Sequence, residues 1–147
     1  MTTITAQATQ VYSIFIRATP EQIWEAITTP EFTHRYFYGT HLTVTPDAYQ
    51  SLDSDGNAMI DASVSEFEPP RRLVHTWLAL YDPDLAAEAE SRVTWEIESQ
   101  DGGITKLTVV HDQLEGAPKT AESVAGGWMY VLSSLKTLLE TGKPLAG

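Results

Sequence analysis

A long amphipathic segment near the C-terminal end limits most what this chain can fold into. Its apolar residues recur at the i, i+4, i+7 and i+8 spacing of one helical face: Val124, Trp128, Val131, Leu132, Leu135, Leu138 and Leu139. We expect Thr120 to cap the helix and Gly142 to end it, which gives a helix about 30 Å long. A helix with one long apolar stripe needs a large apolar partner, and the strands predicted upstream provide it.

Two consecutive glycines, Gly126 and Gly127, interrupt the first half of this helix. Each costs about 1 kcal/mol relative to alanine in a helix interior. The pair therefore predicts either a close approach to the helix backbone, by the sheet or by a ligand, or a bend in the helix.

Upstream, the apolar pattern predicts a strand, two short helices and a run of about six strands. The first strand covers residues 11–17, and the two helices cover residues 20–27 and about 30–36. Thr19 and Gln22 form the sequence signature of a capping box at the first helix. The later strands are predicted at residues 42–44, 48–52, 58–67, 72–80, 91–98 and 104–111, with a polar connection over 81–90.

The strand over residues 91–98 has the clearest alternation. Val93, Trp95 and Ile97 share one face, and polar residues occupy the other. A sheet with one solvated face is typically antiparallel. The order of elements therefore predicts an α+β fold, in which a twisted antiparallel sheet curls around the C-terminal helix.

Size and composition predict a single domain over residues 1–147. No apolar run approaches the roughly 18 residues of a membrane span, and residues 1–5 lack the basic and apolar parts of a secretory signal. The chain has no cysteine, which excludes disulfides and thiolate chemistry. We therefore expect a cytoplasmic protein.

The formal charge is −11, from 20 acidic and 9 basic residues. Such a charge argues against nucleic acids and anionic membranes as partners, so neither nucleic-acid binding nor membrane insertion is expected. Nothing in the sequence decides between a monomer and a homodimer, although edge strands and the 81–90 connection could support a dimer.

Three stretches, residues 16–24, 69–77 and 126–142, carry a family resemblance that extends over nearly the whole chain. With them the chain resembles the START-like superfamily (SRPBCC, the helix-grip fold), and most of all the branch similar to the activator of heat-shock-protein ATPase. The resemblance implies a curved sheet of about six to seven strands around a long C-terminal helix, often with an apolar cavity between them. Because members include ligand carriers, cyclases and co-chaperone domains, it does not fix the function.

One passage departs from the family pattern. After Phe32 many relatives have a tryptophan-rich stretch punctuated by glycines, whereas residues 36–41 here read YFYGTH. The mouth of the implied cavity is therefore expected to differ.

The alternation also predicts which side chains point inward. The last strand offers Leu107, Val109 and His111. The strand over 72–80 offers either the odd-numbered set with His75 and Trp77 or the even-numbered set, and we prefer the first because Trp77 is the larger body to bury. An aromatic-lined pocket with a few polar groups would suit a small molecule. The predicted ligand-binding residues are Trp24, Phe37, His75, Trp77, Trp95, His111, Val124, Trp128 and Leu132. The alternative is a filled core with hydrogen-bonded histidines.

Catalytic and metal motifs are weak. His111 is the only candidate catalytic residue, and it cannot pair with Asp112 because adjacent strand residues point to opposite faces. His34 and His41 lack a ligand spacing for a metal. No phosphate loop, nucleophile elbow or dinucleotide fingerprint occurs, so we expect neither a metal nor a cofactor.

Three functions from different classes remain. The leading hypothesis is a protein that binds a small hydrophobic or aromatic molecule beneath the C-terminal helix. The second is a cofactor-free cyclase or isomerase with His111 as general base. The third is a co-chaperone-like interaction domain, which predicts no cavity and an exposed apolar patch on the sheet.

Overall fold

The computed structural model describes residues 8–145. One antiparallel sheet of seven strands has the order β1-β7-β6-β5-β4-β3-β2. Its strands are β1 (Gln10–Ile16), β2 (His41–Val44), β3 (Ala48–Leu52), β4 (Ala58–Glu68), β5 (Arg72–Trp77), β6 (Ser91–Ser99) and β7 (Thr105–Asp112). The helices are α1 (Pro20–Thr28), α2 (Pro30–Tyr36), α3 (Pro83–Ala86) and α4 (Pro118–Thr141), and a 3-10 turn, η1 (Asp101–Gly103), joins β6 to β7. The α+β helix-grip fold is confirmed.

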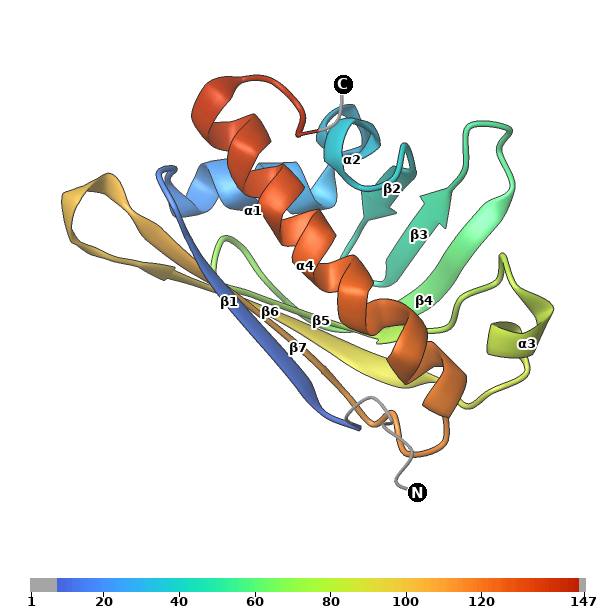
Figure 1. Ribbon diagram of the computed structural model, residues 1–147. Helices are drawn as coiled ribbons and strands as arrows, with labels where there is room; N and C mark the ends of the chain where they lie inside the picture. The colour runs from blue at the N-terminus through green and yellow to red at the C-terminus, as the bar shows by residue number, and fades with distance from the viewer. Residues whose placement is uncertain (1–7, 146–147) are drawn as a thin grey trace.

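The curved sheet wraps around α4, which crosses one of its faces (Figure 1). The short helices α1 and α2 lie beside the C-terminal end of α4, and α3 lies near its N-terminal end (Figure 1). The apolar stripe of α4 is buried against the sheet. No helix within residues 8–145 is long and apolar enough to cross a membrane.

The first short helix begins where the sequence predicts. The Thr19 hydroxyl accepts a hydrogen bond from the Gln22 backbone N–H, and the Gln22 side chain accepts one from the Thr19 N–H. Pro20 stands at the first helical position, where no backbone donor is needed. This capping box confirms the prediction.

The N-terminus of α4 differs from the prediction. The N-cap is Ala117, which offers no side-chain bond, and Thr120 lies within the first turn. The Glu88 carboxylate supplies the missing acceptors: it takes bonds from the N–H groups of Lys119 (3.0 Å) and Thr120 (2.8 Å) and from the Thr120 hydroxyl (2.8 Å). The expected cap at Thr120 was therefore wrong, because an acid from the 81–90 connection takes that role.

The sheet register confirms the predicted inward faces. His75 pairs with Val93, and Val93 pairs with His111, so these three residues share the face under α4. The strand predicted over residues 72–80 ends at Trp77 and is followed by one isolated bridge between Ile60 and Ala79. The helix α3 was not predicted, since its few residues lie in a polar connection.

Candidate functional site

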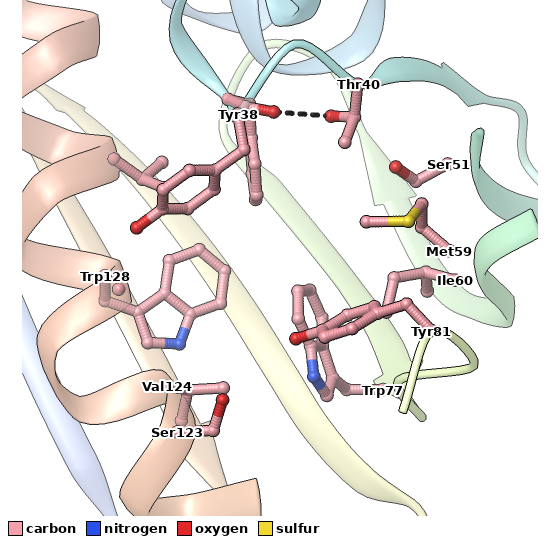
Figure 2. Close-up of a pocket in the computed structure, with 13 residues that line it drawn as sticks. Tyr38, Thr40, Ser51, Met59, Ile60, Trp77, Tyr81, Ser123, Val124 and Trp128 are labelled. Atoms are coloured by element: carbon pink, nitrogen blue, oxygen red, sulfur yellow. Dashed lines mark hydrogen bonds between the residues drawn. The ribbon is translucent and has the colours of Figure 1, made fainter. Parts of the chain in front are cut away.

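A cavity of about 300 Å³ opens between α4 and the strands β3, β4 and β5. This volume is at the lower end of the range for small-molecule sites. Figure 2 shows the side chains that converge on it from α4 on one side and from the sheet on the other. The lining residues are Phe37, Tyr38, Thr40, Ser51, Met59, Ile60, Trp77, Tyr81, Ser123, Val124, Gly127, Trp128 and Val131.

Tyrosines surround the mouth of the cavity. Tyr38 and Tyr81 line it and are 59% and 50% exposed, and the Tyr38 ring stacks on Tyr130 of α4 at 5.3 Å. Tyr38 has a φ of 53° and Gly39 a φ of 69°, so two successive left-handed residues turn the chain between α2 and β2. This turn directs the Tyr38 ring toward α4, and burial raises the pKa of its phenol, which stays protonated at neutral pH.

Aromatic rings form the inner wall. The Trp128 ring lies 5.4 Å from that of Trp77, 5.4 Å from that of Trp95 and 6.1 Å from that of Phe37. The Trp128 and Phe37 rings meet edge to face, an arrangement that stabilises aromatic pairs beyond their buried area. This wall can therefore hold a flat apolar molecule.

His111 fixes the orientation of the Trp128 indole. The Trp128 Nε1–H donates to Nδ1 of His111 (3.0 Å), so the imidazole proton sits on Nε2 and is directed at the Ser91 hydroxyl oxygen (2.7 Å). His111 is fully buried, and burial lowers its pKa to about 4. The imidazole is therefore neutral at physiological pH, and both of its nitrogens are engaged.

His75 of β5 makes an equivalent pair of hydrogen bonds. Its Nδ1–H donates to the Thr76 carbonyl oxygen (2.8 Å), and its Nε2 accepts the indole N–H of Trp95 (3.0 Å). The Tyr49 ring stacks on the imidazole at 3.6 Å. Burial lowers the pKa of His75 to about 3, so this histidine is also neutral.

The cavity wall offers hydrogen bonds but no charge. None of the described residues that line it is an acid, a lysine, an arginine or a histidine. Its hydrogen-bond donors are hydroxyls and two indole N–H groups, of which that of Trp128 is already bonded to His111. The Thr40 hydroxyl is already used, because it donates to the Phe37 carbonyl oxygen at 2.6 Å (Figure 2).

Four of the nine predicted ligand-binding residues line the cavity: Phe37, Trp77, Val124 and Trp128. Four others, His75, Trp95, His111 and Leu132, are buried in the protein interior outside the lining. Trp24 lies elsewhere, with its ring edge against Phe67 at 5.2 Å, because it falls off the buried face of α1.

Some lining residues, from loops and from the strands β3 and β4, were not predicted from the sequence. Tyr38 and Tyr81 follow the ends of α2 and of the β5 region, where periodicity gives no direction. Ser51 comes from β3, where its alternation with Tyr49 could have placed it on the inner face. Met59 has the opposite parity to the inward Ile60, and it reaches the cavity where the β3–β4 register shifts, which alternation does not predict.

The remaining polar candidates lie outside the cavity lining. Asp112 points to the outer face and accepts two hydrogen bonds from Arg92 (2.6 and 2.9 Å), as strand parity predicts. The rings of His34 and His41 stack at 5.6 Å. Within residues 8–145, no three acids or histidines come close enough together to hold a metal ion.

Several solved structures share the fold of this chain. DynU16, a protein of the dynemicin biosynthetic locus, is 26% identical with a TM-score of 0.74; the match covers 94% of this chain and 49% of DynU16, so this chain spans about half of its length. MLL2253 from Mesorhizobium loti is 24% identical over 90% of this chain and 96% of its own (TM-score 0.72). PFC0360w, an HSP90 activator from Plasmodium falciparum, is 20% identical over 94% and 99% (TM-score 0.73). No match was found among curated proteins.

The two structures below 25% identity are evidence for the fold only. The family evidence is stronger, since a family model described as Activator of Hsp90 ATPase homolog 1-like protein matches residues 17–140, which is most of the chain. The expected resemblance is thereby confirmed, and the chain belongs to the Activator of Hsp90 ATPase homolog 1-like protein family.

Proposed function

We propose that this protein binds a small, uncharged and mainly apolar molecule, most suitably an aromatic one, in the cavity beneath α4. The observation that carries the proposal is the composition of the cavity wall. Trp77, Trp128 and Phe37 supply ring surfaces, and no lining residue carries a charge. A charged ligand would lose its hydration there without an opposite charge to replace it.

The enzyme hypothesis has less support. A general base needs a free lone pair within reach of its substrate. His111 does not line the cavity, its Nδ1 accepts the Trp128 indole, and its Nε2–H is directed at Ser91. Since the His75 nitrogens are engaged in the same way, neither buried histidine is available as a base.

The interaction-domain hypothesis also has less support, because it predicts no cavity. Val11 and Phe15 are exposed on the outer face of the sheet, at 61% and 54%. Arg92 and Asp112, whose ion pair occupies the same face, limit the apolar area there. Ligand binding therefore remains the function that we propose.

Native mass spectrometry of freshly purified protein, compared with the same sample after denaturation, is the first test. An excess mass that is released on denaturation would identify a bound molecule and also report the oligomeric state. Titration with Nile red, an uncharged apolar dye, tests the cavity where no molecule is retained.

A matched pair of variants locates the site. Val124 lines the cavity, so Val124→Phe should fill part of it and weaken Nile red binding at least tenfold. Val11→Phe makes the same substitution on the exposed outer face and should leave binding unchanged. Absence of both a retained molecule and dye binding would contradict the proposal, as would equal effects of the two variants.

A further inference from the structure

Trp77 differs from Trp95 and Trp128 in its hydrogen bonding. The indole N–H groups of Trp95 and Trp128 each donate to a buried histidine at 3.0 Å. Nε1 of Trp77 has no acceptor, and it is the one buried side-chain polar atom without a partner among the described residues. Nε1 itself is buried, so bulk water does not reach this N–H in its place.

A buried donor without an acceptor is unusual, and it destabilises the protein by the full desolvation of that group. Trp77 is also a lining residue of the cavity. In Figure 2 its indole nitrogen lies on the side of the ring that is turned toward Val124 and Ser123 of α4. A ligand acceptor at this end of the cavity would therefore remove the desolvation cost of this unpaired N–H. No other described lining residue has a buried side-chain polar atom without a partner.

We propose that the ligand is an uncharged aromatic molecule whose carbonyl or ether oxygen accepts a hydrogen bond from Nε1 of Trp77. This inference rests on the proposed function and specifies the chemistry of its ligand. The ring system of the ligand packs on Trp128 and Phe37, and its oxygen lies toward Ser123. A carboxylate does not suit the same position, since the wall has no cation to replace its hydration.

Nε1 of Trp77 is covered in this structure, so the proposed bond requires lining side chains to move when the ligand enters. Tyr38 and Tyr81, which line the cavity and are 59% and 50% exposed, are the side chains with the most room to move.

The test uses 9-fluorenone and fluorene, two flat molecules of nearly the same shape that differ in one carbonyl oxygen. Isothermal titration calorimetry on the full chain should give a dissociation constant about tenfold lower for fluorenone than for fluorene. In ¹H–¹⁵N spectra, fluorenone should move one indole N–H resonance downfield, and fluorene should not. The 9-fluorenone-2-carboxylate anion should bind more weakly than either.

Trp77→Phe keeps an aromatic ring and removes the donor, so the preference for fluorenone should disappear and the two dissociation constants should become about equal. Trp24→Phe is the matched control, because it makes the same substitution outside the cavity, where Trp24 packs on Phe67, and should keep the preference. If Trp77→Phe does not fold, the indole resonances of the unmodified protein decide the question alone.

The outcomes separate this inference from the proposed function. Equal affinities for the two probes, or a preference that persists in Trp77→Phe, would overturn the role of Trp77 and leave ligand binding intact. If neither probe binds and no molecule is retained by the purified protein, the proposed function fails and this inference fails with it.

Discussion

The indole N–H of Trp128 donates to Nδ1 of His111 at 3.0 Å, which couples the cavity wall to the protonation state of a buried histidine. An imidazolium would carry a proton on Nδ1 and place two donors face to face. Protonation therefore breaks the bond that orients Trp128. The same holds for Trp95 and His75.

This coupling predicts that the free energy of unfolding decreases as the pH is lowered. Burial lowers the pKa values of His111 and His75 to about 4 and about 3, whereas both titrate near 6.5 when unfolded. Below pH 6.5 the unfolded chain binds more protons than the folded protein at these two histidines. Their stabilisation is therefore complete above pH 6.5 and is lost progressively as the pH falls toward the folded pKa values. The free energy of unfolding from urea titrations should fall by about 1.4 kcal/mol per pH unit for each histidine.

Two variants separate the buried histidines from the exposed ones. His111→Gln keeps a side-chain acceptor for Trp128 and should remove about half of the slope between pH 6.5 and 5. His34→Gln combined with His41→Gln removes the two exposed histidines and should keep the full slope. A free energy of unfolding that stays constant from pH 7 to 5 in the unmodified protein would contradict the prediction.

The Glu88 carboxylate gives a second prediction. It accepts three hydrogen bonds from Lys119 and Thr120 at the start of α4, and these bonds lower its pKa. Glu88→Ala should reduce the free energy of unfolding by about 1 kcal/mol, the usual effect of losing a helix cap. Glu90→Ala removes an exposed acid from the same connection and should change the urea midpoint little, so equal losses would argue against capping.

The sequence predicted the sheet and its inner face well. The alternation of Val93, Trp95 and Ile97 requires one buried face, and the register then places His75 and His111 on that face as well. The capping box at Thr19 was also predicted correctly, because it depends on two residues three positions apart, whereas the single N-cap expected at Thr120 was wrong.

The cavity could be predicted only in part. Alternation says which face a side chain occupies but not whether the space under that face is filled. Trp95 and Trp77 share the inner face, yet Trp95 packs into the core and Trp77 lines the cavity. Tyr38 reaches the mouth through a left-handed turn, and Glu88 caps a helix about thirty positions away; both depend on tertiary packing.

The two glycines of α4 give a third prediction. A Cβ at Gly126 would meet nothing within 4 Å, so no close approach explains this glycine. Gly126→Ala should therefore raise the free energy of unfolding by about 1 kcal/mol without changing Nile red affinity. A decrease in stability would show that the helix needs a glycine at this position.

Gly127 is different because it lines the cavity. A Cβ there would lie 3.6 Å from the Tyr38 hydroxyl oxygen, which is ordinary van der Waals contact. Gly127→Ala should raise stability by a similar amount but narrow the mouth and weaken Nile red binding several-fold. Unchanged binding in both variants would show that ligands do not pass between Tyr38 and α4.

The exposed edge of β1 gives the last prediction. The Lys136 ammonium donates to the Phe15 carbonyl oxygen (2.7 Å), and the Arg17 N–H donates to the Glu140 carboxylate (2.8 Å). Lys136 and Glu140 also pair with each other at 2.8 Å. Side chains of α4 thus occupy backbone groups of an edge strand that would otherwise be available to another strand.

Replacing both Lys136 and Glu140 by alanine should therefore increase self-association, which sedimentation velocity can measure over a range of protein concentrations. Lys119→Ala combined with Glu122→Ala is the matched control, because it also removes one positive and one negative charge from α4 but at its other end. If both double variants associate equally, loss of surface charge is the cause. The other edge of the sheet is the short strand β2, which is unchanged in both double variants. If only the variant that lacks Lys136 and Glu140 associates, these two side chains protect the β1 edge.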